Sequence, residues 1–270
     1  MSDLDALGRT ALIPFWARVH DALLPSPILG DHAAAALAPE VERRFGAEPV
    51  GDATRVGCCL RNRAMDEWIA DLAANGNSGV RTVVDIGVGL DTRLRRRPQL
   101  AEHYVEVDGE AIMNLRDDLL PGTGAVRVRA DGMSVDEWID AVDHQVSSVT
   151  VLVLEGVLAY QDPSRVSRFF ADAARCLPGA FVVFDNLSPL AAWPANRPAA
   201  LAQGRPRYVW SPWFTRRIPA GSQRLRILQE RGFGDFPRDL TREFSNRNRI
   251  VYSLPPMRRA YRLTLARLPD

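Results

Sequence analysis

Five short apolar segments alternate with helical segments through the middle of this 270-residue sequence. Their sequences are TVVDI (82–86), YVEV (104–107), AVRVR (125–129), TVLVLE (150–155) and AFVVFD (180–185). Strands that alternate with helices at this spacing build βαβ units around a mainly parallel sheet. The pattern therefore predicts an α/β fold with a doubly wound sheet.

Two regions lie outside this alternating core. We expect residues 1–60 to form a helical lid segment and residues 61–270 to form the main domain, with a lid insertion at about 186–221. The insertion is rich in proline and aromatic residues and is too long for a simple connection in a compact domain. Near the C-terminus, GFGDFPRDLTREF and YRLTLARL are expected to supply the last two strands.

One predicted helix, residues 61–74, has a clear apolar face. Met65, Trp68, Ile69 and Leu72 share that face, as does Arg61 at its end. A charged side chain on an inward face either extends to solvent or meets an anion. We expect Arg61 to meet the carboxylate of a ligand.

Capping signals predict the starts of two further helices. Ser134 and Glu137 have the spacing of a capping box, and Asp162 is a capping residue followed by a proline. The basic stretch RLRRRP (93–98) is interpreted as a solvated helix start.

Charge and cysteine content exclude several classes of function. The sequence has 34 basic residues, all of them arginine, and 33 acidic residues, so its net charge of +1 gives no reason to expect a nucleic-acid partner. Cys58, Cys59 and Cys176 have no metal-binding spacing, so we expect reduced thiols and no metal site. Neither a signal peptide nor an apolar run of about 18 residues is present. A cytoplasmic protein without membrane contact is expected.

Polar residues end four of the predicted strands. Asp85 and Gly87 end the first, and Asp108, Asp131 and Glu155 end the next three. In an open α/β sheet, ligands bind beyond the carboxyl ends of the strands, where strand order reverses. With the strand order 3-2-1-4, these residues would line a single crevice.

The loop after the first strand, VVDIGVGLDTR (83–93), separates two kinds of cofactor. A dinucleotide requires Gly-x-Gly-x-x-Gly with free amides facing a pyrophosphate. Here Thr92 takes the place of the third glycine, and Asp91 would repel a phosphate at the helix start. S-adenosylmethionine, which carries a sulfonium and an ammonium and no phosphate, fits this loop better.

Each polar group of that cofactor can be matched to a side chain. We expect Asp108 to accept the ribose hydroxyls, Asp131 to accept from the adenine amine, Glu155 to face the ammonium and Arg61 to pair with the carboxylate. The remaining expected cofactor-binding residues are Asp85, Gly87, Val88, Gly89 and Gly132.

Methyl transfer to oxygen needs alignment first and, for a hydroxyl acceptor, a base. Tyr160, His20 and His32 are the candidate catalytic residues, the histidines because they lie in the predicted lid. His103 and His144 precede strands and so belong to the opposite end of the sheet. A carboxylate acceptor would need no base.

The motifs together resemble a known family. VVDIGVGLDTR (83–93), YVEVD (104–108), EGVLAY (155–160) and LRNRAMD (60–66) resemble the leucine carboxyl methyltransferase family, and within it the bacterial branch of tetracenomycin-type polyketide O-methyltransferases. The likeness covers roughly residues 20 to 265. It implies a class I methyltransferase fold, Rossmann-like, with a seven-stranded sheet whose last strand is antiparallel, and S-adenosylmethionine as donor.

By motif, the resemblance assigns the cofactor-carboxylate role to Arg61, the ribose role to Asp108 and the adenine-side role to Asp131, with Glu155 as the glutamate after the fourth strand. Three positions depart from the family pattern. They are Gly132 after the adenine-side acid, Gly109-Glu110 after Asp108, and Gln161 after Tyr160.

The expected function is O-methylation of a hydroxyl or carboxylate of a small natural product. Two alternatives stay open: methylation of a peptide or protein C-terminal carboxylate, and a regulatory protein that binds the cofactor without catalysis. RYVWSPWF (207–214) could form an aromatic wall for a planar acceptor. Four nearby arginines could select an acidic one: Arg205, Arg207, Arg216 and Arg217.

Overall fold

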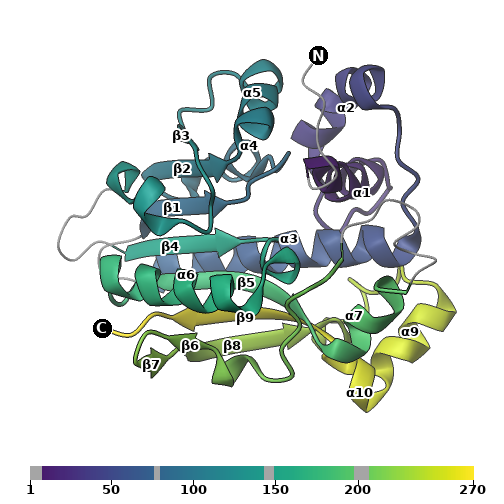
Figure 1. The fold of residues 1–270 in the computed structure, drawn as a ribbon. Coiled ribbons are helices and arrows are strands. Elements are labelled where there is room, and N and C mark those ends of the chain that lie inside the picture. The colour runs from purple at the N-terminus through teal and green to yellow at the C-terminus, as the bar shows by residue number, and fades with distance from the viewer. Residues whose placement is uncertain (1–7, 76–79, 143–148, 198–206) are drawn as a thin grey trace.

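The computed structural model describes residues 8–75, 80–142, 149–197 and 207–270. A seven-stranded sheet runs through its centre in the order β3-β2-β1-β4-β5-β9-β8 (Figure 1). The strands are β1 Val80–Ile86, β2 His103–Asp108, β3 Val126–Arg129, β4 Val149–Leu154, β5 Phe181–Leu187, β8 Arg226–Gly232 and β9 Tyr261–Arg267. β1 to β5 are parallel, and β9 pairs antiparallel with both β5 and β8. The predicted seven-stranded sheet with an antiparallel last strand is confirmed.

The five strands predicted from apolar segments are all present, whereas one C-terminal prediction was wrong. GFGDFPRDLTREF does not form a strand; the edge strand β8 precedes it and ends at Gly232. Beyond it come a 3-10 turn, Phe233–Asp235, and the helices α9, Asn246–Ser253, and α10, Pro255–Arg258. A β-carbon on Gly232 would lie 2.2 Å from the carbonyl oxygen of Arg258, so the chain turns where another segment crosses it closely.

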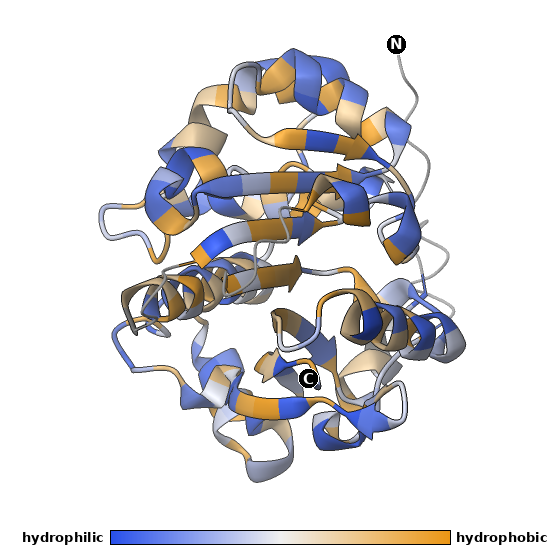
Figure 2. Ribbon diagram, turned by 90° about the vertical axis from the view of Figure 1, so that its left-hand side faces the viewer, coloured by the Kyte–Doolittle hydropathy of each residue, from blue (hydrophilic) through white to orange (hydrophobic). Residues whose placement is uncertain are grey.

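Helices cover both faces of the sheet. α3, Asp52–Asn75, packs on one face, and α6, Pro163–Cys176, packs on the other (Figure 1). Adjacent residues on one strand face opposite sides, so Val83 joins the α3 core and Val84 the α6 core. Figure 2 shows orange, apolar strands in the interior and helices that carry blue residues.

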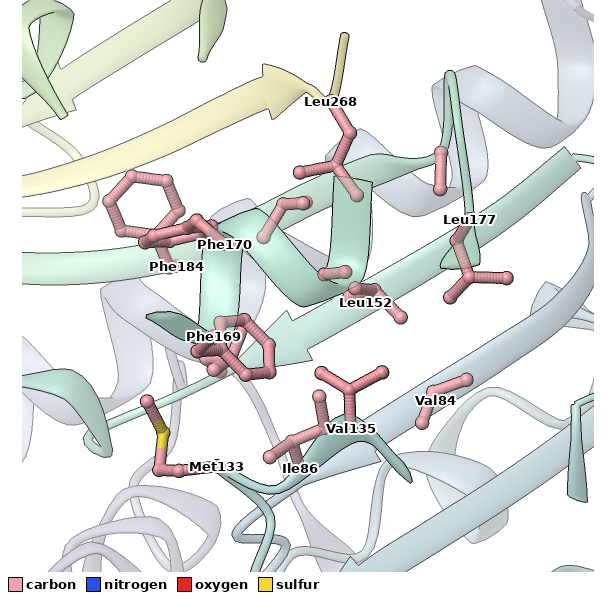
Figure 3. Close-up of a cluster of buried hydrophobic side chains, with 14 of the residues drawn as sticks. Val84, Ile86, Met133, Val135, Leu152, Phe169, Phe170, Leu177, Phe184 and Leu268 are labelled. Atoms are coloured by element: carbon pink, nitrogen blue, oxygen red, sulfur yellow. The ribbon is translucent and has the colours of Figure 1, made fainter. Parts of the chain in front are cut away.

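The α6 side of the core is rich in phenylalanine. Phe169 and Phe170 of α6 lie over Leu152 of β4 and Phe184 of β5 (Figure 3), and all four side chains are fully buried. On the opposite face, Met65, Trp68 and Ile69 are also fully buried, as the helical pattern predicted. Burial of one such side chain contributes roughly 1.5–3 kcal/mol to stability.

The N-terminal segment packs beside the sheet on α5, Glu110–Leu119. It contains α1, Leu12–Ala22, and α2, His32–Phe45, and its apolar residues form a separate cluster with Leu90 and with α5. The expected domain boundary between residues 60 and 61 falls inside α3, which carries the chain from this segment into the core without a break. The division into a lid and a core stays a prediction.

Shorter elements complete the chain. α4, Arg93–Arg96, follows β1, and α7, Pro189–Ala195, begins the expected lid insertion, whose described later part includes β6, Pro219–Ala220, followed by β7, Gln223–Arg224. In the described part of the chain, no helix is both long and apolar enough to cross a membrane.

Of the two helix starts predicted from capping signals, one is confirmed and one was wrong: α6 begins at Pro163, directly after the predicted capping residue Asp162, whereas Ser134 opens no α-helix. Neither Ser134 nor Asp162 makes a side-chain capping hydrogen bond. Glu137 instead accepts the backbone N–H of Asp131 at 3.0 Å, and the predicted helix after Ser134 is reduced to 3-10 turns. Asp131 accepts the backbone N–H of Met133, and the Ser134 hydroxyl donates to Asp131 Oδ2 at 3.4 Å instead of capping a helix.

Candidate functional site

A large cavity opens at the carboxyl ends of the central strands. Its volume is about 1320 Å³, and its lining includes every cofactor-binding residue predicted from the sequence. These are Arg61, Asp85, Gly87, Val88, Gly89, Asp108, Asp131, Gly132 and Glu155. The strand order β3-β2-β1-β4 brings the residues at the strand ends to one edge, because parallel strands end together, and α3 supplies Arg61.

The loop after β1 turns sharply at two glycines. Gly87 has φ +66° and Gly89 has φ +53°, a region that residues with side chains rarely adopt. The Gly87 N–H donates to the carbonyl of Val107 at 2.8 Å, and the Gly89 N–H donates to Oδ2 of Asp108 at 2.8 Å. The loop is thereby held against β2, with Asp108 at its side.

Asp91 uses the amides that a phosphate would need. Its Oδ1 accepts the backbone N–H groups of Thr92 at 2.6 Å and Arg93 at 3.1 Å. Burial opposes ionisation of Asp91, but the guanidinium groups of Arg93 and Arg96 outweigh that cost and hold its pKa well below its usual range. This start of α4 is therefore already occupied by a carboxylate of the chain.

The stretch RLRRRP is partly buried, so its interpretation as a solvated helix start was wrong. Arg93 is only 1% exposed and its guanidinium contacts four carboxylates from four parts of the chain. They are Asp66 at 2.7 Å, Asp85 at 2.5 Å, Asp91 at 2.9 Å and Glu155 at 2.7 Å. Arg61 and Arg96 pair with three of these acids as well, so three guanidinium groups face four carboxylates. Burial raises the pKa of Asp85 to about 7.

A second buried ion-pair cluster ties the N-terminal segment to this loop. Asp31, fully buried at the start of α2, accepts from Arg18 Nε at 2.9 Å, Thr92 Oγ1 at 2.5 Å and Arg96 Nη1 at 3.0 Å. Arg18 also donates to the carbonyl of Leu90 at 2.7 Å. α1 and α2 are thus anchored directly on the glycine loop.

Arg61 lies in the cavity wall, as predicted, but it has partners from the chain. Its Nε donates to Glu155 Oε1 at 2.8 Å, and its Nη1 donates to the hydroxyl of Tyr261 at 2.8 Å. Asp185 Oδ2 lies 3.5 Å from the same Nη1. Glu155 also accepts from Asn62 and Arg93, so its two oxygens are shared among three donors.

The adenine-side residues lie at the rim of the cavity. The Asp131 side chain is 45% exposed and pairs with Arg165 of α6. Gly132 contributes close packing where the family pattern departs: a β-carbon there would lie 2.5 Å from Cγ2 of Ile86. Met133, the next residue, lines the cavity with an apolar side chain.

Of the three candidate catalytic residues, Tyr160 lines the cavity and the two histidines do not. Tyr160 ends a 3-10 turn, Leu158–Tyr160, and lines the cavity 5.2 Å from the ring of Tyr208. Burial raises the pKa of Tyr160, and Tyr208 adds to the shift. His20 packs beside Trp16 and His32 is exposed on α2, and neither is among the cavity-lining residues. The two histidines lie away from the cavity because α1 and α2 turn other side chains, such as Arg18, toward the glycine loop.

The other predicted histidines and the expected aromatic wall are only partly where the sequence placed them. His103 begins β2 at the far end of the sheet, as expected, whereas His144 and Arg205 lie outside the described residues. Within the expected aromatic wall, Tyr208 lines the cavity and Trp210 belongs to the core beside Phe184. The rest of that wall faces outward at Trp213 and Phe214.

Asp185 and Tyr261 are among the cavity residues that the sequence analysis missed. Asp185 lies on β5 near its carboxyl end and is 2% exposed, and Tyr261 begins β9. The rule that found the other acids applied to AFVVFD as well, because it ends in an acid. Tyr261 could be found only from topology, since the first residue of an antiparallel strand reaches the edge where the parallel strands end.

Two structural relatives share the fold. A DUF574 family protein from Streptomyces avermitilis matches with a TM-score of 0.54 and 17% identity, over 94% of this chain and 97% of that one. A crystal structure titled as an S-adenosylmethionine-dependent methyltransferase from Mesorhizobium loti matches with a TM-score of 0.51 and 20% identity, over 76% and 99%. The class I methyltransferase fold predicted from the motifs is confirmed.

Sequence comparison gives the family. The tetracenomycin polyketide synthesis O-methyltransferase of Streptomyces glaucescens is 27% identical over 188 residues, which cover 69% of this chain and 68% of that protein. A putative S-adenosyl-L-methionine-dependent methyltransferase of Mycolicibacterium smegmatis is 27% identical over 252 residues, covering 84% and 82%. Residues 11–174 match the sequence model of the leucine carboxyl methyltransferase family. As the motifs predicted, the chain belongs to the leucine carboxyl methyltransferase family.

Proposed function

We propose that this methyltransferase transfers a methyl group from S-adenosylmethionine to an oxygen atom, a hydroxyl or a carboxylate, of a small natural product. The cavity of about 1320 Å³ carries the proposal, because it exceeds the 300–1,000 Å³ typical of a site for one small ligand. It has room for the donor and for a second small molecule beside it.

The donor side of the cavity suits a cationic nucleoside. Asp108 would accept from the ribose, Asp131 would accept from the adenine amine, and Glu155 would face the ammonium, while Arg61 would hold the carboxylate. The loop amides at Thr92 and Arg93, which a dinucleotide phosphate would require, already donate to Asp91. When bound, S-adenosylmethionine supplies a methyl group activated by its sulfonium.

The acceptor side is lined by aromatic and apolar side chains. They are Tyr160, Leu187, Ala191, Tyr208, Phe233 and Tyr252. Such a lining favours a compact, partly apolar acceptor, which side chains can hold at a fixed distance and angle. Holding two reactants in line contributes up to about 7–11 kcal/mol to catalysis, so positioning is the main task of these residues.

Radiolabelled methyl transfer tests the proposal. Purified protein would be incubated with methyl-labelled S-adenosylmethionine and, separately, with a small-molecule extract and a protein extract of the source organism. We expect label in a small molecule, with Arg61→Ala as a variant of weakened donor binding for comparison. Alkali releases the label from a methyl ester but not from a methyl ether, which separates carboxylate from hydroxyl acceptors. Label found only in protein would instead support the C-terminal carboxylate alternative.

A further inference from the structure

We propose that Tyr261 and Asp185 form a proton relay that removes the hydroxyl proton of the acceptor during methyl transfer. The inference rests on the proposed function and narrows the acceptor to the hydroxyl class. It supplies the base that His20 and His32, which do not line the cavity, leave unassigned.

The two residues meet at the cavity wall. β5 and β9 are antiparallel neighbours, and both Asp185 and Tyr261 line the cavity. The Tyr261 hydroxyl donates to Asp185 Oδ2, and the backbone N–H of Gly156 donates to Asp185 Oδ1 at 2.6 Å. The Tyr261 ring stacks on Phe233, with ring centroids 4.7 Å apart and planes 9° from parallel. The phenol is therefore held in position from two sides.

Arg61 fixes the direction of the phenolic proton. Its Nη1 donates to the Tyr261 oxygen at 2.8 Å, and a guanidinium cannot accept a hydrogen bond. The phenolic proton must then point to Asp185. A phenolic oxygen has two lone pairs, of which Arg61 uses one. The other can accept a hydrogen bond from a hydroxyl in the cavity.

The relay conserves protons and electron pairs. The proton of the acceptor hydroxyl passes to the Tyr261 oxygen as the Tyr261 proton passes to Asp185 Oδ2. The freed oxygen pair of the acceptor forms the bond to the methyl carbon, and the carbon–sulfur bond breaks with its pair left on sulfur. Asp185 returns its proton to water after the product leaves.

The surroundings of Asp185 support a role as a base. Burial raises its pKa, opposed by Arg61 and by the hydrogen bond from Tyr261. The charged or titratable groups that interact with it are Arg61 and Cys58 on α3, Tyr261 on β9, and Glu155 and Tyr160 after β4. A carboxylate with a raised pKa takes up a proton more readily, and only its ionised form can do so. The rate with a weakly acidic hydroxyl should rise with pH as Asp185 ionises.

Simple phenols of graded acidity test the relay. Methyl transfer to phenol, 4-chlorophenol and 4-nitrophenol would be measured in single turnovers with wild type, Tyr261→Phe and Asp185→Asn. With phenol, each variant should lose about 10²- to 10⁴-fold in rate, the range for losing a general base. With 4-nitrophenol, which ionises readily in water, the loss should stay below about tenfold, and the pH dependence of the phenol rate should flatten.

Matched controls separate chemistry from structure. Tyr104→Phe, which removes the hydroxyl of a buried tyrosine that does not line the cavity, should cost less than about tenfold with every phenol, in keeping with one hydrogen bond. Calorimetry with S-adenosylhomocysteine and thermal unfolding would show whether each variant keeps its donor site and fold. Equal losses with phenol and 4-nitrophenol would reduce the pair to a positioning role and overturn the relay. Transfer to benzoate but to no phenol would also overturn it, while leaving O-methylation intact. If the wild type methylates neither, the relay is rejected, and the extract experiment decides the wider proposal.

Discussion

Arg93 illustrates what a single buried side chain can do in this site. Its guanidinium offers five donors in a rigid plane and contacts four carboxylates, a pattern that the compact ammonium of lysine could not reproduce. Arg61 and Arg96 pair with three of the same four acids, so three guanidinium groups face four carboxylates and one negative charge is left in excess beside the cavity. A cationic ligand matches that excess.

The Arg61 assignment can be tested by calorimetry. Arg61→Ala should weaken S-adenosylhomocysteine binding by about 2–5 kcal/mol, the cost of removing one partner of a buried, hydrogen-bonded charge pair. Arg165→Ala, which breaks the half-exposed pair with Asp131, should change binding by less than about 1 kcal/mol. Equal affinities for wild type and Arg61→Ala would refute the assignment.

The turn at Gly87 should tolerate no side chain. Gly87→Ala would force a β-carbon to within 2.5 Å of Cγ2 of Val157 at φ +66°, so we expect a loss of about 1–3 kcal/mol in unfolding free energy. Gly109→Ala, which meets nothing within 4 Å, should change it by less than about 0.5 kcal/mol. Urea unfolding monitored by circular dichroism measures both, and similar values for the two variants would contradict the strain argument.

The histidines of the N-terminal segment should contribute little to the chemical step. His20→Ala and His32→Ala should each lower the single-turnover rate by less than about tenfold, below the range for losing a general base. Neither side chain lines the cavity. A thousandfold loss in either variant, with donor binding intact, would show that the segment moves over the site and carries a base.

Helix α2 is attached to the start of α4 through Asp31, which caps α2 and accepts from Thr92 and Arg96. Asp31→Ala would leave Arg18 and Arg96 with one carboxylate fewer and remove the cap on Ala34, so we expect a loss of about 3–5 kcal/mol in unfolding free energy. His32→Ala, at the exposed neighbouring position, should cost less than about 0.5 kcal/mol. Thermal unfolding of the two variants side by side tests this. A loss of less than about 1 kcal/mol for Asp31→Ala would mean that apolar packing alone holds α2 in place.

The parallel strands could be predicted because each is buried and apolar. β8 could not: it lies at the sheet edge, and its sequence RILQERG leaves most side chains partly or fully exposed, so no apolar pattern marks it. The aromatic residues Phe233, Phe236 and Phe244 drew the prediction one segment too far. They are buried against α3, in turns and short helices instead of a strand.

The site could be predicted where residues end parallel strands, since topology alone gathers them. Arg96 and Asp31 could not be foreseen as partners, because they lie 65 positions apart in the sequence and their contact depends on how α2 packs. Likewise, a sequence shows that Arg61 faces inward but not that Glu155 and Tyr261 already bond to it.

For the whole molecule, ligand stabilisation separates the cofactor classes. S-adenosylhomocysteine at about a hundred times its dissociation constant should stabilise the fold by about 2.7 kcal/mol, seen as a rise in melting temperature. NAD and NADP should leave the melting temperature unchanged, because Asp91 occupies the amides that a pyrophosphate needs. A rise with NAD alone would reverse the choice of cofactor.

The joining of four segments at one guanidinium also bears on how the chain comes apart. Asp66 belongs to α3, Asp85 to β1, Asp91 to the glycine loop and Glu155 to the turn after β4, so no one of them can leave without exposing buried, unpaired charge in the others. α3 in turn is continuous with the N-terminal segment. Partial unfolding that frees this segment alone would also break the contacts of Asp31 and Arg18 with the glycine loop and α4, so we expect the two regions to lose their structure in one cooperative transition.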